Sequence, residues 1–192
     1  MEIRKDVMLL NKIKIETERL KLKALTDDDA NSLFSIFSDP IVMKYWNTEA
    51  WREVSQAHEF ITSSTRAMSE NSSLTLGVFL KDSNTLIGKI MLFSIDNESK
   101  RAEIGFGISR DFWGKGIVAE AANALIDYAF NKLNLRRIEA EVDPDNNASA
   151  KALTRLGFVQ EGLLRQRWEI NGVISDSAMY GLLAKDKAYS QT

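Results

Sequence analysis

Apolar residues alternate with a carboxylate and two glycines over residues 102–108, which read AEIGFGI. This period of two predicts a strand with one apolar face and one nearly bare face that carries Glu103, Gly105 and Gly107. A bare glycine face suits a place where another chain approaches the backbone closely. From Gly116 onward the period changes to that of a helix with one buried side. The apolar positions of this helix are Val118, Ala121, Ala122, Leu125 and Ala129.

The same two periods predict the remaining elements. Strands are expected over residues 17–25, 74–80, 86–93, 136–142, 158–170 and 173–183. One helix is expected to begin after Thr26, and two more are expected over residues 50–68 and 147–156. The buried side of the helix over residues 50–68 is expected to consist of Trp51, Val54, Ala57 and Ile61. The order predicts a single mixed α/β domain over residues 1–192, with residues 1–12 as an N-terminal extension.

Composition narrows the classes of function. The 192 residues are 44% hydrophobic with a net charge of −2, so the chain has no electrostatic signature of nucleic-acid binding. It contains no cysteine, which excludes disulfides, zinc–thiolate sites and thiol nucleophiles. Its single histidine, His58, lies off the apolar stripe of its helix and is expected at the surface; no metal site is expected. No secretory or membrane-spanning apolar run is visible, so a cytoplasmic protein is the expectation.

A glycine turn, Trp113-Gly114-Lys115-Gly116, separates the predicted strand from the predicted helix. The free N–H groups of a helix start favour a phosphate there, although two glycines also serve simply to make a tight turn. Gly114, Gly116 and Ala119 formally match the dinucleotide fingerprint G-x-G-x-x-G/A. Five residues separate the strand from the first glycine, and hairpin-linked strands precede the motif. Both features count against a dinucleotide-binding domain.

Several segments together resemble the GNAT superfamily of acetyl-CoA-dependent N-acetyltransferases, and in particular its ribosomal-protein-alanine N-acetyltransferase-like branch. These segments are TERLKLKAL, AEIGFGI, FWGKGIVAEA, the Asn146-x-x-Ser149 pair, LTRLGF and the NG hairpin before Asp176. The resemblance covers residues 17–183. It implies a mostly antiparallel central sheet of about seven strands flanked by helices, with acetyl-CoA as co-substrate.

The resemblance also implies where acetyl-CoA binds. Its pantetheine arm is expected to pair like an extra strand beside Phe106, Gly107 and Ile108. Its pyrophosphate is expected on the backbone N–H groups of the turn, which assigns cofactor contacts to Gly114, Lys115, Gly116, Ile117 and Val118. Trp113 replaces the family's Gln or Arg, and Val118 replaces its Gly or Ala. Lys115 either steers phosphates or is an ordinary solvated loop lysine.

The acceptor amine must attack the thioester as a free base. An α-amino group loses its proton far more easily than a lysine near neutral pH, so a weak base suffices for a protein N-terminus. Glu103 is the candidate general base, acting through water; the alternative is a solvated strand carboxylate. Ser149 aligns with a serine that some relatives place at the sulfur, and it is the candidate for assisting thiolate departure. The alternative is a helix serine bonded to its own backbone.

Asn146 is expected to contact the cofactor, or else to be a plain turn residue. Tyr45, Trp46 and Trp168 are candidates for the acceptor groove, although aromatic residues are more often core. A ribosomal or other protein N-terminus is the first choice of acceptor. A polyamine, amino acid or amine antibiotic is the second, and a silent acyl-CoA-binding regulator is a third possibility. The expected partners include neither nucleic acid nor membrane, and the expected state is a monomer or homodimer.

Overall fold

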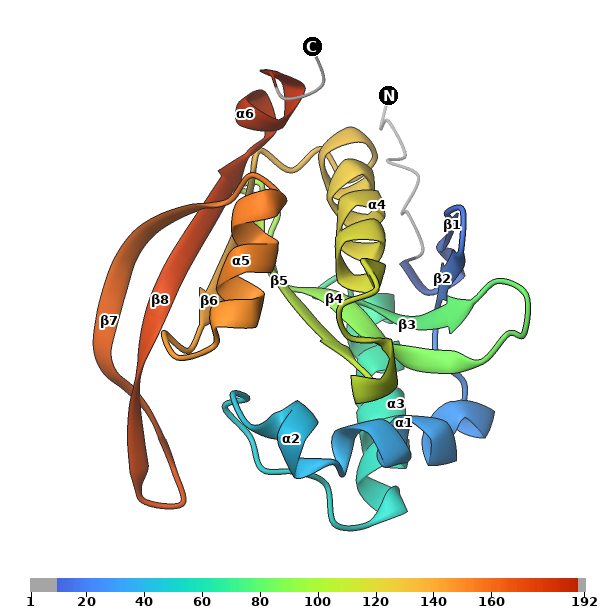
Figure 1. Cartoon of the computed structure of the whole chain (residues 1–192). Helices are drawn as coiled ribbons and strands as arrows, with labels where there is room; N and C mark the ends of the chain where they lie inside the picture. The colour runs from blue at the N-terminus through green and yellow to red at the C-terminus, as the bar shows by residue number, and fades with distance from the viewer. Residues whose placement is uncertain (1–9, 190–192) are drawn as a thin grey trace.

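Eight strands form one sheet in the computed structural model, which describes residues 10–189 (Figure 1). The strands are β1 (Lys14–Glu16), β2 (Leu20–Lys23), β3 (Leu74–Leu80), β4 (Leu86–Asp96), β5 (Arg101–Ile108), β6 (Arg137–Val142), β7 (Val159–Ile170) and β8 (Val173–Leu183). Their order is β1-β2-β3-β4-β5-β6-β8-β7, and only the β5–β6 pair is parallel. The mixed α/β fold and its mostly antiparallel sheet are therefore confirmed.

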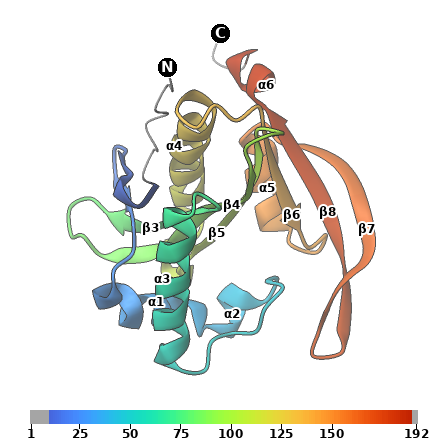
Figure 2. The same ribbon diagram turned by 180° about the vertical axis from the view of Figure 1, so that it is seen from behind.

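Helices cover both faces of the sheet. They are η1 (Leu10–Lys12), η2 (Asp27–Asp29), α1 (Ala30–Phe37), α2 (Pro40–Met43), α3 (Val54–Ser69), η3 (Arg110–Phe112), α4 (Ile117–Asn131), α5 (Asn147–Arg155) and α6 (Ala184–Tyr189). Helices α4 and α5 lie on one face, and α1 and α3 lie on the other, as the view from behind shows (Figure 2). Each face has its own apolar cluster, the larger one under α4 and α5. No described helix is both long and apolar enough to span a membrane.

Local signals in the sequence explain several boundaries. Thr26 and Asp29 form a capping box at the start of η2, which leads into α1. Asn171 and Gly172 both have positive φ, 51° and 77°, as the tight turn between β7 and β8 requires. His58 is a surface residue as expected, with 43% of its side chain exposed and its ring nitrogen 2.5 Å from Asp27. These predictions are confirmed.

Other boundaries differ from the predictions. The strand expected over residues 17–25 is limited to β2, because Thr17 turns the chain and bonds to Leu20. Strand β1, which precedes this turn, was not predicted. The sheet thus has eight strands in the described chain rather than about seven. Helix α3 begins at Val54, after a capping box between Glu53 and Gln56, so Val54 is 36% exposed instead of facing the core. Residues 1–9 of the expected extension lie outside the described residues, whereas Leu10 is buried in the core.

Candidate active site

Strands β5 and β6 diverge soon after they meet. They pair only from Arg101 to Glu103 on β5 with Arg137 to Glu139 on β6. Beyond Glu103, the rest of β5 has no strand partner on this side among the described residues. Figure 1 shows the two strands separating, with the start of α4 beside β5 and the start of α5 beside β6. Phe106, Gly107 and Ile108 therefore lie on an open strand edge, the place expected for an extended ligand that adds to a sheet.

Trp113 closes the end of this open edge. Its indole N–H donates a 2.8 Å hydrogen bond to the carbonyl oxygen of Ile108, while 48% of the residue stays exposed. Arg110 to Phe112 form the single turn η3 between strand and tryptophan. The side chain that departs from the family's pattern thus ties the glycine turn to the last residue of β5.

The glycine turn leads directly into α4. Gly114 and Gly116 have φ of 72° and 74°, a left-handed conformation in which a side chain is strained. A Cβ built at Gly114 would meet nothing within 4 Å, and one at Gly116 would meet only the Arg19 guanidinium at 3.5 Å. Ile117 is buried, so only its backbone faces the turn. An open, glycine-lined helix start with unsatisfied N–H groups fits a phosphate of acetyl-CoA.

Lys115 and Val118 complete the predicted turn motif. The Lys115 ammonium lies 5.2 Å from the centre of the Phe112 ring, and the residue is exposed. Val118 is half-buried at the second position of α4 and packs against the larger apolar cluster. Neither side chain obstructs the turn, so the replacement at Val118 is compatible with backbone contacts to a ligand.

The glycine face of β5 is less bare than the sequence suggests. A Cβ at Gly107 would lie 2.7 Å from Phe37 and 2.8 Å from Trp46. These two rings come from α1 and from the loop after α2, and they already occupy the space above Gly107. The expectation that this face is open to a ligand is wrong at Gly107. The glycine there makes room for the protein's own aromatic layer, while the open feature of β5 is its edge.

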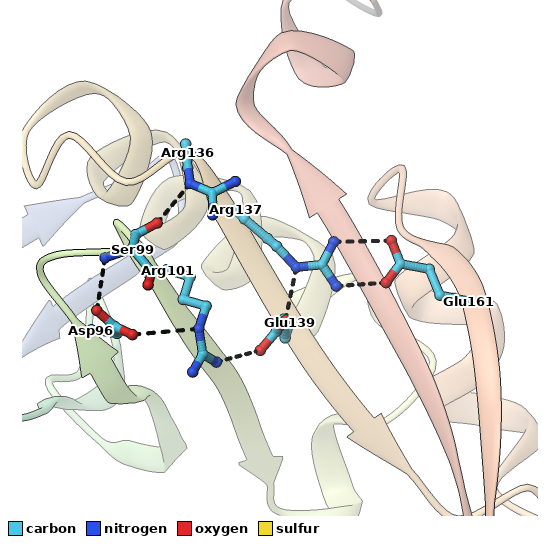
Figure 3. A network of polar contacts seen from close by, with 7 residues as sticks. All are labelled: Asp96, Ser99, Arg101, Arg136, Arg137, Glu139 and Glu161. Carbon is cyan, nitrogen blue, oxygen red and sulfur yellow. Dashed lines mark hydrogen bonds and ion pairs between the residues drawn. The ribbon is translucent and has the colours of Figure 1, made fainter.

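Three carboxylates gather where β5 and β6 diverge. Glu103 on β5 is the register partner of Glu139 on β6, and Glu141 lies two residues further along β6. Glu139 is held on both oxygens, by Arg101 at 2.9 Å and by Arg137 at 2.8 Å (Figure 3). Arg137 continues to Glu161 with contacts of 2.9 and 2.5 Å. Glu139 is therefore a fixed member of a network of charged side chains.

Glu141 is also held in place. Its Oε1 accepts hydrogen bonds from the Trp168 indole and, at 3.4 Å, from Arg167. The register between β7 and β8 shifts between Leu164 and Trp168, and Gln166 in that bulge has a positive φ. The bulge lets two consecutive residues of β7, Arg167 and Trp168, reach the same carboxylate. The side chain of Glu141 is only 12% exposed.

Glu103 is the carboxylate without a partner. It makes no hydrogen bond or ion pair with any described residue. Burial, together with the charges of Glu141 and Glu139, raises the pKa of Glu103 to about 7. A carboxylate with such a pKa exchanges protons readily near neutral pH, which is the property required of a general base.

Asn146 and Ser149 lie at the start of α5. Asn146 caps the helix, and its side-chain oxygen accepts a 3.1 Å hydrogen bond from the backbone N–H of Ser149. The side-chain NH₂ of Asn146 makes no hydrogen bond within the described chain and is available to a ligand. The Ser149 hydroxyl makes no hydrogen bond within the described chain, so the alternative of a serine bonded to its own backbone does not apply.

Two residues near these sites have no signal in the local sequence pattern. Arg19 reaches from the start of β2 to the glycine turn, with its guanidinium 3.0 Å from the Lys115 carbonyl oxygen. Lys89 on β4 is opposite Gly107 and is 4% exposed, surrounded by aromatic rings. Among the described residues, no group of three or more His, Asp or Glu side chains is arranged to hold a metal ion.

Comparison with known proteins agrees with this geometry. Residues 19–159 match the domain family described as "Acetyltransferase (GNAT) domain". The uncharacterized N-acetyltransferase p20 of Bacillus licheniformis is 41% identical over 172 residues, which cover 90% of this chain and 97% of p20. The chain belongs to the GNAT acetyltransferase family. It is an acetyl-CoA-dependent N-acetyltransferase, and the expected resemblance is confirmed.

Two further similarities name different acceptors. A Bacillus subtilis protein named "Putative ribosomal N-acetyltransferase YdaF" is 37% identical over 102 residues, which cover 53% of this chain and 56% of YdaF. A crystal structure of spermidine N-acetyltransferase from Vibrio cholerae in complex with CoA and spermine has a TM-score of 0.80 and 26% identity, and the match covers 90% of this chain and 99% of that one.

Proposed function

We propose that this N-acetyltransferase acetylates the α-amine of a protein N-terminus, with a ribosomal protein as the first choice and Glu103 as the general base. The observation that carries the proposal is that Glu103 is unpaired while Glu139 and Glu141 are both held by cationic or N–H donors. Because two of the three carboxylates already have partners within the protein, the site offers one unpaired carboxylate to one amine. Recognition of a polyamine would use several unpaired anions.

The acidities of the two partners support an α-amine. An unperturbed α-amino group has a pKa of roughly 7.7–8.0, whereas a lysine side chain has about 10.4. With its pKa near 7, Glu103 is matched to the first and is a weak base for the second. Acceptance of the amine proton, directly or through one water, makes the nitrogen nucleophilic.

Acetyl-CoA supplies the thioester. In the proposed reaction Glu103 first takes one proton from the protonated amine. The neutral nitrogen then forms a bond to the thioester carbon, the carbon–sulfur bond breaks, and the second proton lost by the nitrogen ends on the sulfur of CoA. Ser149 is proposed to donate its free hydroxyl to the departing thiolate. The open edge of Phe106, Gly107 and Ile108 is proposed to hold the pantetheine arm.

The remaining proposed cofactor contacts lie at two helix starts. The turn from Gly114 to Val118 is proposed to bind the pyrophosphate through backbone N–H groups, with Lys115 nearby, and Asn146 is proposed to contact the cofactor from α5. Because acetyl-CoA is made and consumed inside cells, the cytoplasm is the proposed location.

A small amine is the second candidate for the acceptor. Its support is the likeness to the spermidine N-acetyltransferase structure, which covers nearly all of that chain. The two candidates differ in the number of cationic groups that the site must hold, so a direct competition between acceptors separates them.

A panel of acceptors tests the proposal. Each acceptor is incubated with acetyl-CoA at pH 7.5, and release of the CoA thiol is followed while mass spectrometry locates the acetyl group. The panel contains peptides with a free N-terminal Ala or Ser, the same peptides blocked at the N-terminus but containing lysine, spermidine, and a simple monoamine. We expect the free N-terminal peptides to have the highest kcat/KM. A higher value for spermidine would overturn the proposal in favour of the second candidate.

A further inference from the structure

Arg19 is bound to the first turn of α4 although the two lie 101 positions apart in the sequence. It stands just before β2, and Figure 1 shows β1 and β2 beside α4. Its backbone N–H donates to Glu120 Oε1 at 2.9 Å, and its side-chain Nε donates to Glu120 Oε2 at 2.6 Å. Thr17 donates to the same carboxylate at 2.5 Å. These contacts fix the direction in which the guanidinium points.

The rest of the guanidinium lies along the glycine turn. Its Nη1 donates to the carbonyl oxygen of Lys115 at 3.0 Å, and its Nη2 lies 3.5 Å from the Cβ position of Gly116. Nη2 makes no hydrogen bond to any described residue, and 45% of the Arg19 side chain is exposed. Arg19 therefore holds the turn with one nitrogen and leaves two N–H donors free beside it.

The charge of Glu120 explains why an arginine is useful at this position. Burial raises the pKa of Glu120, but the hydrogen bonds from Thr17 and Arg19 outweigh burial and lower it, so Glu120 is ionised. An anion in the first turn of a helix stabilises the helix but repels a phosphate that binds there. Arg19 offsets the charge of Glu120 and also brings its free Nη2 donors to the glycine turn.

We propose that Arg19 is a phosphate-binding and turn-positioning residue of the acetyl-CoA site, with its free Nη2 donors directed at the diphosphate of CoA. This inference rests on the proposed placement of acetyl-CoA at the glycine turn. Lysine cannot replace Arg19 fully, because three separate nitrogens of a planar fork serve Glu120, the turn and the phosphate.

Ligands that lack successive phosphates test this role. Affinities of the Arg19→Gln variant for CoA and for dephospho-CoA are measured by calorimetry, together with turnover of acetyl-CoA and of S-acetylpantetheine, which has no phosphate. We expect both affinities to fall by about tenfold, the KM for acetyl-CoA to rise, and kcat to change little. Turnover of S-acetylpantetheine is expected to stay unchanged.

Three results would overturn the proposal. Equal loss of S-acetylpantetheine turnover would show that Arg19 only supports the fold, and an unchanged CoA affinity would show that it does not meet phosphate. A loss confined to CoA, with dephospho-CoA unaffected, would assign Arg19 to the 3′-phosphate and overturn its assignment to the diphosphate. Arg19→Lys is expected to keep the fold and to bind CoA with intermediate affinity. Arg52, an exposed arginine paired with Glu49 at the surface, is the matched control, and Arg52→Gln is expected to bind CoA normally.

A pair of variants separates this inference from the proposed placement of the cofactor. Asn and Asp both tolerate the left-handed conformation of Gly116. Gly116→Asn is expected to keep measurable CoA affinity, whereas Gly116→Asp is expected to lose it. If Gly116→Asp binds CoA as well as Gly116→Asn, the phosphate lies elsewhere and the placement itself fails. If Gly116→Asp loses affinity while Arg19→Gln does not, only the role of Arg19 fails. Neither result depends on the identity of the acceptor.

Discussion

Lys89 and Glu103 lie on adjacent strands and on the same face of the sheet, yet they have opposite relations to their surroundings. Lys89 on β4 pairs with Gly107 on β5. Gly107 and Glu103 are an even number of positions apart along β5, so both lie on the same face. Burial lowers the pKa of Lys89 to about 7, and burial with two like charges raises the pKa of Glu103 to the same value. Equal pKa values therefore arise in two different environments.

Lys89 is enclosed by the protein itself. Its ammonium lies 3.7 Å from the centre of the Phe60 ring and between 4.5 and 5.8 Å from three other ring centres, those of Phe37, Trp46 and Trp51. No carboxylate of the described chain lies within 4.0 Å of it. The ring faces attract the ammonium, which partly offsets the loss of hydration. Lys89 thus joins the aromatic layer of α1 and α3 to the sheet.

Glu103 is only half-buried and lies at the divergence of β5 and β6, where a ligand can reach it. The difference teaches that a shifted pKa indicates chemistry only where the group is accessible to a substrate. The two pKa shifts also have opposite consequences for the stability of the folded state. The raised pKa of Glu103 makes the folded state less stable as the pH rises from about 4.3 to 7, whereas the lowered pKa of Lys89 makes it more stable from 7 to about 10.4.

The largest effect is expected for stability in Lys89→Met. Below pH 7 both folded and unfolded states carry the lysine charge, so the cost of burying it is complete. Above the unfolded pKa the cost disappears, and we expect wild-type stability to rise by up to about 4 kcal/mol between these limits. Methionine fills a similar volume against the rings without a charge. Urea unfolding at pH 6, 8 and 10 should show a variant that is more stable than wild type at pH 6 and that differs from it by less than about 1 kcal/mol at pH 10.

Activity provides the control for Lys89. If Lys89 serves only to pack against the aromatic rings, it contacts no reacting atom. Lys89→Met should then keep kcat within about twofold of wild type. A fall in kcat as large as that of Glu103→Gln would contradict the distinction between the two residues.

The second effect is a loss of turnover in Glu103→Gln. We expect kcat/KM for an N-terminal peptide to fall by about ten- to a hundredfold at pH 6 to 7, where the amine depends on a base. Above the pKa of the amine, roughly 8, the amine arrives neutral, so the two enzymes should converge. The pH–rate profile of both forms measures this ratio. A constant ratio at every pH would show that Glu103 is not the base.

Ser149→Ala is the reference variant for that profile. Assistance to the thiolate does not depend on the protonation of the amine, so we expect a loss of about tenfold that is the same across the pH range. Acetyl-CoA affinity should change little. A loss that shrinks at high pH would place Ser149 in the deprotonation step instead.

Local patterns in the sequence were sufficient to predict the strand, the turn and the helix of residues 101–133. They also located the capping box at Thr26 and the Asn171-Gly172 hairpin. These features depend on residues close in sequence. The aromatic rings above Gly107, by contrast, come from segments 60 or more positions away. The local sequence therefore gave no sign that this face of Gly107 is covered.

Long-range pairs account for the other omissions. Arg19 meets Glu120 across 101 positions, and Glu141 meets Trp168 only because β7 contains a bulge. Lys89 looks like an ordinary strand lysine until four rings from different segments surround it. Such pairs require the folded structure, since neither period nor spacing relates their members.

The smallest expected effect is a shift of the pH–rate profile in Glu141→Gln. After burial, the charge of Glu141 is the next largest cause that raises the pKa of Glu103. Removal of that charge should lower the pKa of Glu103 and move the acid limb of kcat/KM to lower pH by less than about one unit. Trp168→Phe is the matched control, because it removes a hydrogen-bond donor but leaves the Glu141 charge in place. We expect no downward shift in that control. An equal downward shift in both variants would mean that the position of Glu141, and not its charge, sets the acidity of Glu103, and an unmoved limb in Glu141→Gln would mean that Glu103 is not the group that titrates.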